Sequence, residues 1–168
     1  MESSEHGLKI GTIAPNFSST NISDDKVFIL HDYAKKYRGV LINFIRGNFW
    51  THWNKYFTRL KKKFEKFNTL DVKLVAIASD TPREMVKMSK KYEMVYIADL
   101  DTKEIIRAYG AEKLDSTKKP EKNLKVKDCR PITYLLNSES TILWKFVGTK
   151  EKRPPNRKIF AAIKKFLW

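Results

Sequence analysis

The sequence predicts a single α/β domain over residues 1–168, with a central mixed sheet and helices on both of its faces. Apolar strand patterns alternate with helical patterns along the chain, which is typical of α/β proteins. The last two strand patterns are separated by four polar residues, 137–140, which predicts an antiparallel hairpin and therefore a mixed sheet. With 42% hydrophobic residues in a chain of 168, and no internal repeat or linker, one core is expected.

Short apolar runs bounded by turn residues predict the strands. The run 40–45 (VLINFI) has the composition of a buried central strand. An extended lead-in over 11–18 comes before the first strand. The other expected strands are 27–30, 72–78, 95–98, 132–136 and 141–147.

The clearest helical period follows the run 40–45. Large apolar residues recur at spacings of three and four, which places them on one stripe of a helix that faces the core. They are Trp50, Trp53, Phe57, Leu60, Phe64 and Phe67. The pattern predicts one helix from about residue 50 to 68, starting near 48–51 and ending before Asp71.

The remaining helices are predicted by weaker sequence patterns. A helical turn is expected at 32–37, and helices at 82–92, with Pro82 in the first turn, and at 102–109, ending at Gly110. Asn156 can cap a final helix whose apolar face is Ile159, Phe160, Ile163 and Leu167. Residues 113–128 are polar and broken by a proline, which predicts an exposed loop.

The formal net charge of +15 is unevenly distributed. Between residues 33 and 70 the only acidic residue is Glu65, whereas ten are basic: Lys35, Lys36, Arg38, Arg46, Lys55, Arg59, Lys61, Lys62, Lys63 and Lys66. This basic belt could bind polyanions weakly or contact an acidic partner. The alternative is a solvated lysine-rich surface, since lysine supplies most of the cations.

Several classes of site are excluded by residue counts. Cys129 is the only cysteine, so an internal disulfide, a cysteine-based zinc site and an internal dithiol pair are ruled out. His6, His31 and His52 lack metal-ligand spacing, and Asp99 and Asp101 favour a turn at a strand end over a cation site. We therefore predict no cofactor and no metal.

The sequence contains no segment typical of a signal peptide or of a membrane span. The first residues, MESSEHGLKIG, have no apolar segment typical of a signal peptide. No run of 18 apolar residues occurs that could span a membrane. A cytoplasmic location is the expectation.

Four segments, in order along the chain, carry a family resemblance. They are Gly11–Phe17 (GTIAPNF), Val40–Gly47 (VLINFIRG), Val75–Asp80 (VAIASD) and Arg130–Leu136 (RPITYLL). Together they resemble the peroxiredoxin group of the thioredoxin fold, the alkyl hydroperoxide reductase/thiol-specific antioxidant family. The resemblance implies a thioredoxin-like, peroxiredoxin-type fold, an antioxidant oxidoreductase ancestry and a homodimer.

The sequence departs from that family where the chemistry is expected. Members carry R-G-x-W-C-P-x-C or a related motif at the start of a helix, where the helix dipole and an arginine lower the pKa of a thiol. Here residues 46–54 read RGNFWTHWN. Without a gap, Trp50 and Trp53 occupy the two cysteine positions. With a shift of one residue, Thr51 and Asn54 do.

Neither register supplies a thiol, and the remaining candidates are few. A Thr51 hydroxyl would need an adjacent base to act as a nucleophile, and no acidic residue stands beside His52 to orient it. By resemblance, Arg130 corresponds to the arginine that faces the thiolate, and Pro131 to the cis-proline of thioredoxin folds. Cys129, beside Arg130, lies outside the catalytic helix of the family. No catalytic residue is assigned.

Three functions remain open from the sequence. The first is a binding or scaffolding protein whose active site has lost its peroxidatic cysteine. The second is a thiol-dependent antioxidant oxidoreductase whose active-site residues are altered in this chain. The third is a basic module for nucleic acid or an acidic partner, for which no zinc-finger or RNA-binding motif is present.

Overall fold

A computed structural model describes residues 6–46, 51–100, 102–112, 129–149 and 151–168, and the side chains of Thr51 and His52 lie outside this description. The apolar run that predicted a central strand forms β3 (Gly39–Ile45), all seven residues of which are buried. Short side chains and β-branched residues dominate this strand, so it can be covered from both sides of the sheet.

The sheet has five strands in the order β5-β4-β3-β6-β7. β4 (Val72–Ala78) runs parallel to β3, and β5 (Val95–Ala98) runs parallel to β4. β6 (Ile132–Asn137) pairs antiparallel with β3 and forms the expected hairpin with β7 (Ile142–Val147). The mixed sheet predicted from the hairpin is confirmed. A separate hairpin is formed by β1 (Ser18–Asn21) and β2 (Lys26–Ile29).

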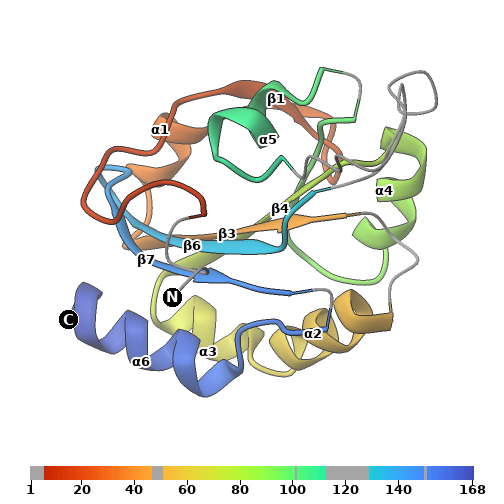
Figure 1. The fold of residues 1–168 in the computed structure, drawn as a ribbon. Coiled ribbons are helices and arrows are strands. Elements are labelled where there is room, and N and C mark those ends of the chain that lie inside the picture. The colour runs from red at the N-terminus through yellow and green to blue at the C-terminus, as the bar shows by residue number, and fades with distance from the viewer. Residues whose placement is uncertain (1–5, 47–50, 101, 113–128, 150) are drawn as a thin grey trace.

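Helices cover both sides of the sheet, as Figure 1 shows. We call the first side the α1/α5 side, after α1 (Leu30–Ala34) and α5 (Glu104–Ala108). The opposite side, the α2/α6 side, is covered by α2 (Thr51–Lys61), α3 (Phe64–Thr69), α4 (Pro82–Ser89) and α6 (Asn156–Leu167).

Residues of β3 alternate between the two sides because successive side chains of a strand point in opposite directions. Val40, Ile42 and Phe44 pack on the α1/α5 side. Leu41 and Ile45 pack on the α2/α6 side. Each strand therefore contributes to two separate apolar clusters.

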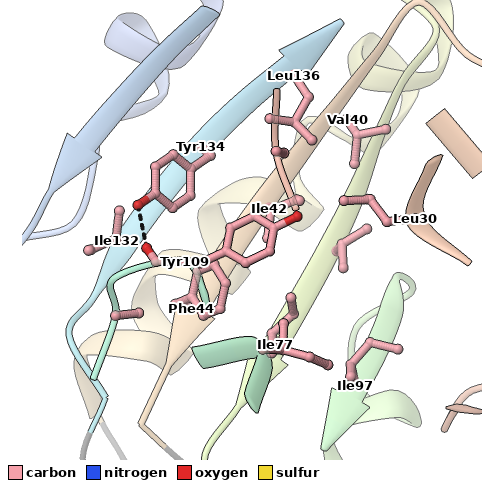
Figure 2. Packing of buried hydrophobic residues seen from close by; sticks show 14 of the residues in the cluster. Leu30, Val40, Ile42, Phe44, Ile77, Ile97, Tyr109, Ile132, Tyr134 and Leu136 are labelled. Atoms are coloured by element: carbon pink, nitrogen blue, oxygen red, sulfur yellow. Dashed lines mark hydrogen bonds between the residues drawn. The ribbon is translucent and has the colours of Figure 1, made fainter. Parts of the chain in front are cut away.

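The α1/α5 side is a mixture of aliphatic residues and tyrosines, shown in Figure 2. The Tyr134 hydroxyl donates to the Tyr109 carbonyl oxygen at 2.7 Å, and the Tyr109 hydroxyl donates to the Pro15 carbonyl oxygen at 2.6 Å. Phe44 packs 5.2 Å from the ring of Tyr109. The hydroxyls tie α5 and the segment around Pro15 to the sheet while their rings fill the core.

The predicted helix over 50–68 is two helices. α2 ends at Lys61, and Lys63 has a non-helical conformation (φ −116°, ψ 14°) before α3 begins at Phe64. An unbroken helix would place two like-charged pairs four residues apart, Arg59 with Lys63 and Lys62 with Lys66, and such pairs destabilise a helix. The change of direction lets Phe67 pack 4.8 Å from Phe160 of α6, whereas Phe64 is only half-buried.

Other helix boundaries also differ from the prediction. α4 ends at Ser89 rather than at residue 92, and α1 and α5 are shorter than expected. Asn156 does not cap α6: Pro155 is the cap residue, and the Asn156 Nδ2 atom donates to the Arg59 carbonyl oxygen at 3.2 Å instead. Gly110 follows α5 with φ +65°, the left-handed conformation expected of a residue after a helix.

Several sequence expectations lie beyond what the structure tests. The loop predicted over 113–128 and residue Asp101 fall outside the described residues. None of the described helices is long and apolar enough to cross a membrane. The single-domain division over 1–168 stays a prediction.

Candidate functional site

The family resemblance places the candidate site between the end of β3 and the first turn of α2. Trp50 lies outside the described residues. Thr51 is the first residue of α2, but its side chain is not described. Trp53 and Asn54 follow in the same turn and are described. The geometry of the site is therefore built from these two residues and their neighbours.

Trp53 is a core residue with 1% of its surface exposed. Its ring packs against Tyr56 at 5.6 Å, in an edge-on arrangement, and against Phe57 at 5.5 Å. The indole Nε1 atom is buried and has no hydrogen-bond partner among the residues that the structure describes. An unpaired buried donor is uncommon in folded proteins and usually indicates a missing ligand, a water molecule or a functional constraint.

Arg153, in the segment between β7 and α6, covers the other face of the Trp53 ring. Its guanidinium carbon lies 4.0 Å from the ring centroid, which is a cation–π contact. Burial lowers the pKa of Arg153 to about 10, and the neighbouring Tyr56 and Cys129 partly offset this shift. The side chain is still cationic at neutral pH.

A buried polar network lies beneath Trp53. The Tyr56 hydroxyl donates to Asn43 Oδ1 at 2.8 Å, and the Thr133 hydroxyl donates to the same oxygen at 3.1 Å. Asn43 Nδ2 in turn donates to the Val75 carbonyl oxygen at 3.3 Å. Burial raises the pKa of Tyr56 well above its ordinary value, so this phenol stays neutral and acts as a donor rather than as a base.

Asn54 lies on the half-buried edge of α2. Its carbonyl oxygen accepts hydrogen bonds from the Thr58 hydroxyl at 2.7 Å and from the Tyr92 hydroxyl at 3.2 Å. No hydrogen bond of its side-chain amide is found within the described part of the chain. In the shifted register Asn54 would take a cysteine position, and here it fastens α2 to the segment after α4.

Cys129 lies in the segment before β6, outside α2. It is 3% exposed, and its Sγ atom donates to the Arg130 carbonyl oxygen at 3.5 Å. Residue 129 forms an isolated antiparallel bridge with Glu112, and the Arg130 amide donates to the Ala111 carbonyl oxygen at 2.6 Å. The thiol is therefore shielded by the backbone of two segments, and the neighbouring Arg130 is half-buried.

The peptide bond before Pro131 is trans, so the cis-proline expected by resemblance is not found. The chain runs straight into β6 in the trans form. The Pro131 carbonyl oxygen accepts a hydrogen bond from the Gly148 amide at 2.7 Å, which extends the pairing of β6 with β7.

The other titratable candidates have structural roles. The His31 Nε2 atom lies 2.7 Å from the Ala14 carbonyl oxygen. Asp99 Oδ2 accepts a hydrogen bond from the Ile106 amide at 2.8 Å, and burial raises the pKa of this carboxyl above its ordinary value. The described residues hold no group of three or more histidine, cysteine, aspartate or glutamate side chains arranged to bind a metal.

Sequence reasoning missed Arg153 and the network of Asn43, Tyr56 and Thr133. Asn43 did carry a signal, since it is the one polar residue in the run VLINFI. Arg153 gave no periodic signal, because it stands in an irregular lysine-rich segment before two prolines. Its contact with Trp53 joins residues one hundred positions apart.

The sequence is similar to one known protein family. A profile of the AhpC/TSA family matches residues 10–145, most of the chain. The chain belongs to the AhpC/TSA family. No curated protein matches the sequence.

Solved structures with the same fold include known peroxiredoxins. Peroxidoxin BcpB from Mycobacterium tuberculosis has 12% sequence identity and a TM-score of 0.78, covering 94% of this chain and 97% of that chain. The reduced 2-Cys peroxiredoxin of Plasmodium vivax has 16% identity and a TM-score of 0.76, covering 94% and 81%. The mitochondrial 2-Cys peroxiredoxin of Plasmodium falciparum has 12% identity and a TM-score of 0.69, covering 94% and 93%.

These comparisons confirm the peroxiredoxin-type thioredoxin fold predicted from the four motifs. All four motifs, the last of which is Arg130–Leu136, lie within the stretch that the AhpC/TSA-family profile matches, residues 10–145. The only cysteine of the chain is Cys129, which is buried. The positions of Trp50, Thr51, Trp53 and Asn54 relative to the family cysteines stay a prediction.

Proposed function

We propose that this AhpC/TSA-family protein is a binding protein that does not act as a thiol peroxidase. The observation that carries the proposal is the burial of Trp53. In the register that keeps Arg46-Gly47 on the family motif, Trp53 takes the second cysteine position, and it is packed into the core beneath Arg153. An aromatic side chain there stabilises α2 but has no group that can reduce a peroxide.

The remaining groups do not supply that chemistry either. A peroxidatic cysteine attacks as a thiolate and becomes a sulfenic acid, which a second thiol must then reduce. Cys129 is buried, is not in α2 and has no second cysteine to pair with. Tyr56 is a neutral donor to Asn43 rather than a nucleophile.

Peroxide consumption tests the proposal directly. We would mix the purified protein with hydrogen peroxide or an organic hydroperoxide, with and without dithiothreitol, and follow peroxide loss by stopped flow. A 2-Cys peroxiredoxin serves as the positive control, and Cys129→Ser as the matched variant. We expect the wild type to be no faster than an ordinary free cysteine.

The two ways of failing lead to different conclusions. Rapid turnover that disappears in Cys129→Ser would assign an altered thiol active site to the segment before β6 and support the oxidoreductase alternative. Rapid turnover that survives in Cys129→Ser would show that a group other than sulfur is catalytic. Either result contradicts the proposal.

The assembly and location of the protein stay predictions. The family resemblance favours a homodimer, which sedimentation at several protein concentrations would detect. A cytoplasmic location is a proposal from the sequence alone. Neither affects the peroxide assay, since that assay measures chemistry per chain.

A further inference from the structure

A hollow of about 830 Å³ lies against the outer face of α2. Three segments form its walls: the exposed edge of α2, the turn after α4 and the segment before α6. In Figure 1 these segments meet at the end of the molecule where α2 and α4 are labelled. The lining residues are Asn54, Lys55, Thr58, Arg59, Lys91, Tyr92, Glu151, Lys152 and Arg153. Its volume is in the range of small-molecule sites in proteins.

The charge around this hollow is strongly positive. Five of the nine lining residues are cations, and Glu151 is the only carboxylate. No ion pair to any of these five cations is formed within the part of the chain that the structure describes. Five cations around one concave surface, with Glu151 as the single lining carboxylate, raise the local concentration of anions.

Arg153 is held with part of its guanidinium group unsatisfied. Its Nη1 atom donates to the Thr149 and Lys152 carbonyl oxygens. Its Nε atom is buried and has no hydrogen-bond partner in the described ranges of the chain. The ring of Trp53 supports the guanidinium from one side. These contacts hold the charge of Arg153 in a fixed position at the hollow, where it attracts an anion.

Both walls of the hollow are fastened to α2. On one wall the Tyr92 hydroxyl contacts the Asn54 carbonyl oxygen at 3.2 Å and the Thr58 hydroxyl at 3.1 Å. On the other wall Asn156 Nδ2 donates to the Arg59 carbonyl oxygen at 3.2 Å. The segments that carry the cations therefore need little rearrangement before a ligand binds, which lowers the free-energy cost of binding.

We propose that this pocket binds a small molecule that carries several phosphate groups. The inference rests on the proposed binding role and names its ligand class. Phosphate groups linked in a short chain concentrate several negative charges in a volume that the pocket can hold. A nucleic-acid strand carries the same groups but spreads them along its length, so it would bind to the lysine-rich surface rather than to one concave site.

Calorimetric titration with three probes tests the ligand class: inorganic triphosphate, inorganic orthophosphate and a short single-stranded RNA. We expect triphosphate to bind at one site per chain and at least about tenfold more tightly than orthophosphate, because it engages several cations at once. Binding of triphosphate should weaken as salt increases. Equal affinities for triphosphate and orthophosphate would contradict a site for several phosphates.

A pair of variants with the same change in charge locates the site. Arg59→Gln with Lys91→Gln removes two cations of the pocket, and Lys164→Gln with Lys165→Gln removes two exposed cations of α6 that do not line it. We expect the first pair to weaken triphosphate binding about tenfold or more and the second pair to change it less than about twofold. Lys55→Gln gives an independent check with a single exposed side chain, and thermal unfolding verifies that each variant is folded.

Equal weakening by the two pairs, or tighter binding of RNA than of triphosphate, would overturn the proposal in favour of general attraction to the basic surface. Absence of any triphosphate binding would overturn it too. The peroxide assay tests the proposed function separately. If the protein has no peroxidase activity and does not bind triphosphate, only the ligand class is disproved. Rapid peroxide turnover would disprove the proposed function.

Discussion

On the α1/α5 side of the sheet the buried tyrosine hydroxyls of Tyr109 and Tyr134 both find carbonyl acceptors. On the α2/α6 side Trp53 Nε1, Arg153 Nε and Asn156 Oδ1 are buried without a hydrogen-bond partner in the described part of the chain. The two sides bury apolar residues equally well, since Phe44 on the first and Phe57 on the second are both fully buried. They differ in how their polar atoms are satisfied.

The difference between the two sides lies in where buried polar atoms without a described partner occur. A buried polar atom without a partner costs free energy, so a ligand or a water molecule that pairs with it would stabilise the fold. Trp53 belongs to α2, Arg153 to the segment before α6, and Asn156 is the first residue of α6. These segments flank the position of the family cysteines and the cationic pocket. These three buried polar atoms without a described partner therefore lie on the α2/α6 side, near the candidate site.

The largest expected effect tests whether apolar packing is equal on the two sides. Phe57→Ala and Phe44→Ala should each lower the free energy of unfolding by about 3–5 kcal/mol, because each removes a fully buried ring. Phe166→Ala, at a side chain 40% exposed, is the control and should change it by less than about 0.5 kcal/mol. Urea denaturation measures all three. A much smaller loss for Phe57→Ala would mean that α2 is not packed as described.

A medium effect distinguishes the polar networks. Tyr134→Phe removes the donor to the Tyr109 carbonyl and the acceptor of the Leu8 amide at 2.9 Å, and should cost about 1–3 kcal/mol. Tyr56→Phe should cost less, about 0.5–1.5 kcal/mol, because Thr133 still donates to Asn43 Oδ1. The losses are compared from the denaturant midpoints of the variants, provided that the slope of the unfolding free energy against denaturant concentration is the same for each. The reverse order would show that the α2/α6 network is the tighter of the two.

The smallest effect is a pH dependence of opposite sign on the two sides. Burial raises the pKa of Asp99, so the folded state holds its proton more tightly than the unfolded state does. The stability of the wild type relative to Asp99→Asn should therefore increase as the pH falls from 7 towards 4. The asparagine keeps an oxygen that can accept from Ile106, so differences in hydrogen bonding are small.

Arg153 provides the opposite sign. Its pKa is lowered to about 10 by burial, so the unfolded state binds the proton more tightly than the folded state does. The stability of the wild type relative to Arg153→Met should increase as the pH rises through 10. Thermal unfolding of each pair across its pH range tests both shifts. A flat difference for either pair would contradict the corresponding burial.

Local patterns predicted most of the fold and little of the candidate site. Runs such as VLINFI and VKLVAIA located β3 and β4, because strand burial depends on neighbouring residues in the chain. The break between α2 and α3 was missed, since the stripe of large apolar residues continues through Lys61–Lys63. The period alone does not show that Phe67 turns towards α6.

By itself, then, the sequence determined the mixed sheet, the family and the absence of a thiol at residues 46–54. Composition and the order of motifs are properties of the chain that folding does not alter. Only the tertiary structure placed Arg153 over Trp53 and brought Lys55, Lys91 and Lys152 around one hollow. Those contacts join segments that are distant in sequence, and they depend on how α2, α4 and α6 pack on the sheet rather than on any local period.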